Sequence, residues 1–170
     1  MRRSSACVLA SIIALALGHS PGVRAAGPAV FTVQVDETSA FDACDFPVEN
    51  HTTGAIRIHD VFDEQGNLVR EIANYNLKIT YTNSMTGESV TSRSAGPDIL
   101  QVNPDNSANL LSIGLLARIV VPGQGLLAVQ TGKLALFFTD PSDEEPDVLF
   151  EAGPHDDDTA VNDAICQAIG

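Results

Sequence analysis

The sequence predicts an all-β protein, either an antiparallel β-barrel or a β-sandwich, of about eight to ten strands with a short C-terminal helix. Three observations lead to this prediction. Apolar residues alternate with polar ones at a period of two, turn residues recur about every 8–12 positions, and the last residues show helical spacing. We favour the barrel because successive segments form hairpins and glycines fall inside the longest strands, where curved sheets need them.

The clearest strand covers residues 73–81, in which polar Asn, Lys and Thr side chains separate the apolar ones. Its apolar face consists of Ala73, Tyr75, Leu77, Ile79 and Tyr81. Helical spacing cannot produce this separation, because periods of 2 and 3.6 fall out of step within about four residues. The turn around Gly66 should join this strand to the preceding one in a long antiparallel hairpin.

The other strands are shorter or less regular. The apolar stretches 110–121 and 126–138 have the composition of buried helices, but their β-branched residues, internal glycines and the turn at residues 122–125 favour a strand pair. The remaining strand segments are 31–35, 46–48, 56–62, 90–93, 99–102 and 148–150.

The C-terminal residues predict one helix. Asp158 or Thr159 can cap its N-terminus. Apolar side chains then recur on one face, with Cys166 beside them. The members of this face are Val161, Ala164, Ile165, Ala168 and Ile169.

Residues 1–25 have the features of a cleavable secretory signal peptide. Arg2 and Arg3 precede an apolar run at residues 6–17, which is shorter than the roughly 20 residues that span a membrane. Small residues end at Ala25, where we place the cleavage; an uncleaved anchor is the alternative. We therefore expect residues 26–170 to form a single secreted domain.

The expected mature chain is strongly acidic. Loss of Arg2, Arg3 and Arg24 leaves six of the nine basic residues against 22 acidic ones, a net charge of about −16. Nucleic acids and anionic membranes require a basic surface, so the charge excludes them as expected partners. Self-repulsion favours a monomer.

Two cysteines remain after removal of the signal peptide. Cys44 and Cys166 lie near opposite ends of the mature chain, and an even number of cysteines in an exported protein predicts a disulfide. The bond would close a loop of about 120 residues and pin the C-terminal helix to the first part of the sheet. A two-cysteine metal or redox site is the alternative, which no Cys-x-x-Cys motif supports.

The segment 44–48, Cys-Asp-Phe-Pro-Val, resembles a motif near the mature N-terminus of small secreted actinobacterial proteins that have no assigned activity. A polar turn at residues 83–87 and the late Cys166 add to the resemblance, which implies a secreted protein and brings no functional residues. The succession of hairpins is similar to the barrel of dirigent and allene oxide cyclase proteins, a likeness of fold that carries no function.

Few residues point to catalysis. His59 beside Asp60 is a candidate general base with an orienting carboxylate, and the alternative is a surface histidine on the same polar strand face as Arg57. Ser112 precedes Ile113 and Gly114 but lacks the leading glycine of a nucleophile elbow. We assign no catalytic residue and no cofactor from the sequence.

An acidic loop offers the best cation candidates, Asp140, Asp143, Glu144 and Glu145. Hard cations such as Ca²⁺ bind about six to eight oxygens, which such a loop can supply. The spacing does not match an EF-hand, so a solvated loop is the alternative. His155 and the three aspartates after it form a weaker metal candidate, with an acidic helix start as its alternative.

The expected function is that of a secreted, non-enzymatic protein. It is either structural, or a domain that binds an extracellular partner or a small apolar ligand inside a barrel. A cavity lined by Tyr75, Leu77 and Ile79 would favour ligand binding, whereas a filled interior would favour a structural or surface-interaction role.

The alternative function is that of a barrel-type cyclase or isomerase with dispersed polar groups. It requires at least two side chains of a candidate set to converge in one pocket with perturbed protonation. The set is His51, Arg57, His59, Asp60 and Tyr81.

Overall fold

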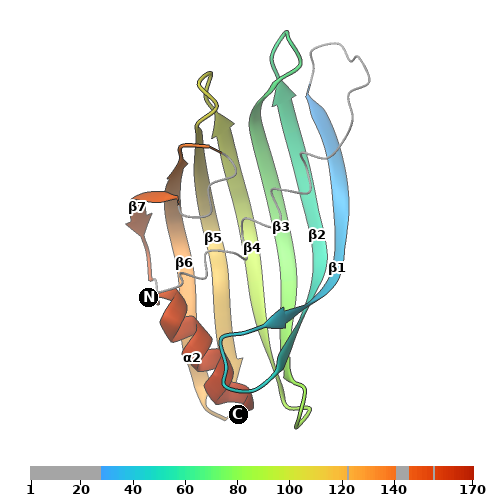
Figure 1. Ribbon diagram of the computed structural model, residues 1–170, viewed down its shortest axis with the longest axis vertical. Coiled ribbons are helices and arrows are strands. Elements are labelled where there is room, and N and C mark those ends of the chain that lie inside the picture. Colours follow the sequence, from blue (N-terminus) through green and yellow to red (C-terminus); the bar gives the residue numbers. More distant parts are fainter. Residues whose placement is uncertain (1–27, 122, 141–145, 155) are drawn as a thin grey trace.

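The computed structural model describes residues 28–170 except 122, 141–145 and 155, and its strands form one antiparallel sheet (Figure 1). The seven described strands pair in the order in which they occur in the chain. They are β1 (Ala29–Phe41), β2 (Val48–Phe62), β3 (Leu68–Asn83), β4 (Ser89–Val102), β5 (Ala108–Val121), β6 (Gly125–Phe138) and β7 (Asp147–Ala152), and helix α2 (Asp158–Ile169) follows them. The all-β class with one C-terminal helix is therefore as predicted.

The predicted hairpins are present, but the strands are fewer and longer than expected. The turn around Gly66 joins β2 to β3, and residues 110–138 form the β5–β6 hairpin rather than a buried helix. Segments 90–93 and 99–102, predicted as separate strands, belong to the single strand β4. Pro97 has a partner in β3 but none in β5, so β4 passes through it at an interruption of the ladder.

The sheet is open, so the barrel that we favoured is wrong. Within the described residues, β1 pairs only with β2 and β7 only with β6. Strand β7 has six residues against 13 in β1, which leaves little length for a closing ladder. The edge strands also expose apolar side chains, among them Phe31 at 40% and Phe150 at 53%.

Glycines inside the strands allow close approaches between neighbouring backbones and bend the sheet. Gly114 and Gly132 are direct partners across β5 and β6. At Gly132 the φ angle is +128°, and an added Cβ would lie 2.0 Å from the carbonyl oxygen of Ala152. Only glycine allows both this conformation and this approach of the neighbouring backbone. The glycines inside the long strands thus curve the sheet without closing it.

Helix α2 covers one end of one sheet face, which we call the inner face (Figure 1). Asp157, one residue before the predicted cap, accepts a hydrogen bond from the Ala160 backbone N–H at 2.8 Å through Oδ1. The apolar helix face packs against side chains of five strands. The buried members of this cluster are Val48, Ile79, Tyr81, Val90, Ile119, Ala128, Val161, Ala164, Ile165 and Ile169.

The helix is also tied to the chain before β2. Cys44 and Cys166, separated by 122 positions, form a disulfide with Cα atoms 5.5 Å apart. The side-chain amide of Asn83 donates a hydrogen bond to the Ile169 carbonyl oxygen at 3.0 Å, which holds the helix C-terminus against the end of β3. The far half of the inner face carries two apolar clusters that contain no helix residue.

Candidate functional site

Strands β4 and β5 pair along only part of their length. Their ladder runs from the pair Ala95–Leu115 to the pair Val102–Ala108. Toward α2 no β4–β5 backbone pair is present among the described residues, although the two strands remain close to each other. We call this unpaired stretch, residues 89–94 of β4 and 116–121 of β5, the fissure.

Serine hydroxyls replace the backbone ladder where the fissure begins. The Arg118 backbone N–H donates to Ser92 Oγ at 3.1 Å, and Ser94 Oγ donates to the Leu115 carbonyl oxygen at 3.4 Å. Both serines are buried on the inner side of β4. Beyond them, residues 89–91 and 119–121 face each other with no backbone pairing between them in the described chain.

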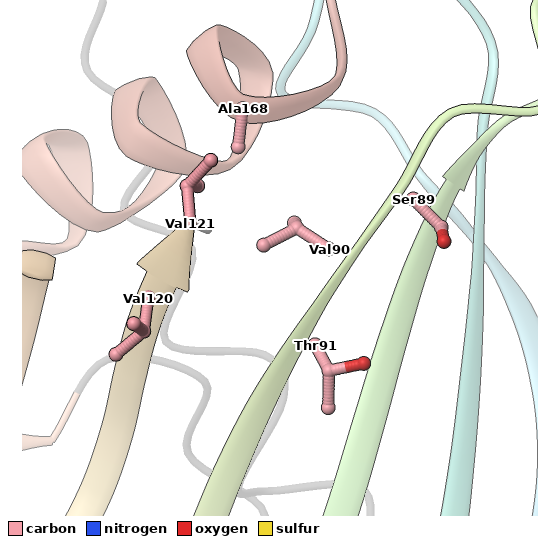
Figure 2. A pocket seen from close by; sticks show the side chains of 6 residues that line it. All are labelled: Ser89, Val90, Thr91, Val120, Val121 and Ala168. Atoms are coloured by element: carbon pink, nitrogen blue, oxygen red, sulfur yellow. The ribbon is translucent and has the colours of Figure 1, made fainter. Parts of the chain in front are cut away.

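Two hollows lie along the fissure. The first, about 230 Å³, is lined by Ser89, Val90, Thr91, Val120, Val121 and Ala168. Figure 2 shows Val90 and Val121 pointing toward one another across the gap, beside Ala168 of α2. The second, about 180 Å³, is lined by Thr91, Arg93, Leu115, Arg118 and Val120. The fissure therefore has an apolar floor and a basic rim.

Three basic side chains gather around this rim on the outer face, the face opposite the helix. Lys78 of β3 is the direct cross-strand partner of Arg93 of β4, and Arg93 and Arg118 line the second hollow together. All three are exposed, and none makes an ion pair within the part of the chain that the structure describes. Like charges placed directly opposite each other destabilise a sheet, so the fold alone gives no reason for this arrangement.

A second polar group lies on the inner face, in the half that α2 does not cover. Asp60 of β2 is paired with Glu71 of β3, and Asp98 of β4 is paired with Ser112 of β5. The Tyr75 ring belongs to the apolar cluster beside them. We call these five residues the inner polar cluster.

The inner polar cluster is poorly satisfied. Four of its buried atoms, Asp60 Oδ1, Tyr75 Oη, Asp98 Oδ1 and Ser112 Oγ, have no hydrogen-bond partner. Each unsatisfied buried group costs about 1–3 kcal/mol. The hydroxyls of Ser112 and Tyr75 nevertheless lie close enough to Asp98 to lower its pKa, so the cluster is partly satisfied.

Burial among other acids perturbs the carboxyl groups. Burial, with the nearby charges of Asp60 and Asp98, raises the pKa of Glu71 to about 7. Burial also raises the pKa of Asp98, and the neighbouring hydroxyls of Ser112 and Tyr75 offset part of this rise. The pKa of Tyr75 is raised by burial and by the Asp98 charge. Glu71 is thus close to half-protonated at neutral pH.

The residues expected to serve an enzyme do not converge. His59 and Asp60 are consecutive in β2, so their side chains lie on opposite faces of the sheet, and Asp60 alone joins the inner polar cluster. Arg57 shares the outer face with His59. Tyr81 packs edge-on against Phe41 at the helix end, with ring centroids 5.0 Å apart.

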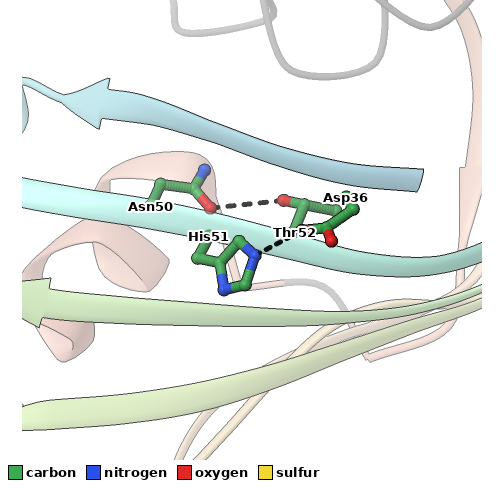
Figure 3. Close-up of polar contacts among 4 residues, drawn as sticks. All are labelled: Asp36, Asn50, His51 and Thr52. Atoms are coloured by element: carbon green, nitrogen blue, oxygen red, sulfur yellow. Dashed lines mark hydrogen bonds and ion pairs between the residues drawn. The ribbon is translucent and has the colours of Figure 1, made fainter.

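His51 forms a surface contact with the neighbouring strand. Its Nε2 lies 2.7 Å from Asp36 Oδ1 of β1, and both side chains are exposed (Figure 3). Thr52 donates to Asn50 Oδ1 at 3.3 Å on the other face of β2. The pair lies on the exposed outer face, apart from the other residues of the candidate set.

The cation candidates fall largely outside the described residues, which exclude Asp143, Glu144, Glu145 and His155. Asp140 is described and has interactions of its own. Across the described chain, no three His, Cys, Asp or Glu side chains are arranged to hold a metal ion. That includes the carboxyls of the inner polar cluster.

The interior is filled where a ligand cavity was considered. Tyr75 and Leu77 belong to one buried cluster and Ile79 to another, and neither hollow of the fissure touches them. Neither hollow therefore matches the cavity that would have favoured a small apolar ligand, and the structural and surface-interaction roles both remain predictions.

Sequence reasoning missed several residues of both sites. Glu71 continues the inward face of the strand that begins at Ala73 in our prediction, and a charged residue in that alternation was a readable signal. Asp98 lies in the gap between the segments 90–93 and 99–102, which were predicted as separate strands. The proximity of Arg93 to Arg118 depends on how β4 and β5 lie side by side where their backbone ladder stops, for which the sequence has no signal.

No protein-family model matches this chain, and searches of curated proteins and of solved structures found no match either. Among the described residues, no helix combines the length and the apolar character needed to cross a lipid bilayer.

Proposed function

We propose that this protein is a secreted, non-catalytic interaction domain that binds an anionic partner at the fissure. The observation that carries the proposal is the gathering of Lys78, Arg93 and Arg118 beside two hollows, where none of the three forms an ion pair with a described residue, in a chain with 22 acidic residues. Half of the six basic residues after position 25 lie here.

The net charge limits what the partner can be. Screening at physiological ionic strength confines electrostatic interactions to about 8 Å, so a short anionic segment responds mainly to the basic rim. An extended polyanion or an anionic membrane also meets the surrounding acidic surface, which repels it. The proposed partner therefore carries its negative charge on a few neighbouring residues.

Paired charge-reversal variants test the proposal. The probe is the acidic peptide acetyl-Glu-Val-Glu-Val-Glu-amide, and its lysine counterpart serves as the charge control, both measured by isothermal titration calorimetry. We expect the acidic peptide alone to bind, and Arg93→Glu/Arg118→Glu to weaken it about tenfold or more. The matched control is Arg57→Glu/Arg70→Glu, which makes the same charge change on the outer face away from the fissure.

Equal losses in the two double variants would show that net charge alone governs binding and would overturn the proposal. Preference for the lysine peptide would do the same. Circular dichroism and thermal melting of both variants establish that they are folded.

The alternative function, an acid–base enzyme of cyclase or isomerase type, has one observation in its favour. The pKa of Glu71 is raised to about 7 beside Tyr75 and Asp98, and a general acid or base works best when its pKa is near the operating pH. Native mass spectrometry of freshly purified secreted protein tests it. Isomerisation conserves mass, so the retained small molecule is also compared by liquid chromatography before and after incubation at pH 7: a new retention time at the same mass supports an enzyme, and an unchanged one opposes it.

A further inference from the structure

The sheet has two edge strands of different character, and β1 is the one that invites a partner (Figure 1). Strand β1 has 13 residues, and within the described chain β2 is its only neighbour. We propose that the first half of β1 pairs with β1 of a second copy of this chain, which joins two sheets edge to edge in a twofold-symmetric dimer. Strands β2 and β3 separate this edge from the fissure, so the inference does not depend on the function proposed above.

Strand β1 lacks the features that usually protect an edge strand. Proteins keep such edges from pairing by making them short, or by placing charged residues or proline in them. Strand β7 follows this rule, since it has six residues and includes Asp147 and Glu151. Residues 29–35 of β1, Ala-Val-Phe-Thr-Val-Gln-Val, contain neither a charge nor a proline, and five of the seven are exposed. This half of β1 therefore presents an open and uncharged strand edge.

The apolar inner face is incomplete at this edge. On β2, the direct partners of Phe31 and Val33 are two isoleucines that are buried in the inner face. Phe31 is nevertheless 40% exposed and Val33 39% exposed, since no described strand lies beyond β1. A further strand at this position would cover both side chains and satisfy the backbone groups of β1 that point away from β2.

The sequence of this half is complementary to itself. In an antiparallel pair centred on Thr32, Phe31 of each copy lies opposite Val33 of the other copy. Pairs of an aromatic and a β-branched residue stabilise antiparallel strands, and so does a Thr–Thr pair at the centre. The other pairs within residues 29–35 also join uncharged side chains, so no like charges face each other in the seven-residue ladder. A second copy therefore fits this edge.

The charges nearest to the ladder remain far apart in the dimer. Arg57 of β2 is the direct neighbour of Thr32, so the two copies of Arg57 are separated by three strand spacings, about 14 Å. Asp36 is the first acidic residue of β1, and its two copies lie eight positions apart along the strands, about 27 Å. Both distances exceed the screening length of about 8 Å at physiological ionic strength. The net charge, from which we predicted a monomer, therefore opposes pairing at this edge only weakly.

Sedimentation velocity tests the dimer on the secreted chain, without its signal peptide and with the disulfide intact. We expect a monomer at about 1 µM and a dimer at about 200 µM, with more dimer at higher salt because residual repulsion is screened. Phe31→Lys places a charge in the ladder and should weaken the dimer about tenfold or more. Phe150→Lys is the matched control, the same change at an exposed apolar residue of β7.

Three results of sedimentation would overturn the proposal. One is a wild-type protein that remains monomeric over the whole concentration range. Another is an equal loss of association in the two lysine variants. The third is assembly beyond the dimer, which would indicate head-to-tail pairing of β1 with β7. Circular dichroism of both variants establishes that they are folded.

A cysteine pair tests the register without disturbing the apolar side chains. Thr32→Cys places the two new thiols directly opposite each other, with Cα atoms about 4.5–5.5 Å apart, which is within reach of a disulfide. Gln34→Cys is exposed on the same strand, but its copies lie four positions apart, about 14 Å, and cannot bond. Under mild oxidation and non-reducing electrophoresis, Thr32→Cys should give a covalent dimer at least about tenfold faster. Equal rates, or no covalent dimer with either variant, would refute β1–β1 pairing in this register.

Discussion

Replacement of Glu71 by Gln should stabilise the protein, and the gain should grow with pH. In the folded protein burial and the neighbouring acids raise the pKa of Glu71 to about 7, from an ordinary value of 4.5. Between these two values the unfolded chain releases a proton that the folded chain retains. The wild-type protein therefore loses stability as pH rises through this window. A glutamine at this position cannot ionise, so the variant avoids this loss.

The size of the effect follows from the two pKa values. One pKa unit corresponds to about 1.4 kcal/mol, so ionising Glu71 in the fold costs about 3 kcal/mol in full. About 2.5 kcal/mol of this cost arises between pH 5 and pH 8. The free energy of unfolding should be measured at both pH values by guanidinium chloride titration at constant ionic strength, with the disulfide intact.

Glu88, an exposed glutamate in the turn before β4, provides the matched control. Glu88→Gln makes the same chemical change on the surface and should shift stability by less than about 0.5 kcal/mol at either pH. A Glu71→Gln gain that is identical at pH 5 and pH 8 would refute the reasoning, because it would mean that Glu71 ionises as freely in the fold as in the unfolded chain.

Two further predictions concern the bend of the sheet and the disulfide. Gly132→Ala should lower the melting temperature far more than Gly66→Ala. Both glycines have a positive φ, but an added Cβ meets the Ala152 carbonyl oxygen only at Gly132. Similar melting curves for the two variants would contradict this close backbone approach. The variant Cys44→Ser/Cys166→Ser should lose roughly 4–5 kcal/mol of unfolding free energy in denaturant titrations, the loop-entropy figure for a closed loop of this length, and a loss below about 1 kcal/mol would show that the packing of α2 holds without the bond.

The hairpins could be predicted because their information is local. The alternation over residues 73–81 assigns each side chain to a face, and the turn around Gly66 fixes which strand lies next to it. The same alternation continues to Glu71, one inward position before the predicted segment begins at Ala73. A charged residue on an apolar face breaks the local pattern, as is expected at a site where buried acids lie together.

Neither the open edge of the sheet nor the interruption of the β4–β5 ladder could be predicted, because both depend on how strands lie relative to distant strands. The glycines inside the strands predict curvature, but whether a curved sheet closes depends on strand number and stagger, which no single strand encodes. Likewise Ser92 lies inside the predicted strand 90–93 and Ser94 directly after it, and nothing in the sequence marks either as a bridge. Their role in bridging β4 to β5 in place of a backbone ladder exists only once Arg118 and Leu115 lie opposite them.

Charge explains how an acidic protein can keep a fissure of unpaired backbone without self-association. Unpaired strand edges are templates for pairing with other chains, and proteins usually cover them or place charges beside them. In this chain the charged side chains of Arg93 and Arg118 flank the unpaired stretch, and we expect the overall negative charge to disfavour association between copies of the protein at this stretch. Selection at the fissure then depends on a partner whose acidic charge is confined to a few residues, since such a segment gains the local attraction and meets little of the long-range repulsion. Raising the salt concentration should therefore weaken binding of the acidic peptide at the rim, and an affinity that does not change with salt would contradict an electrostatic contact.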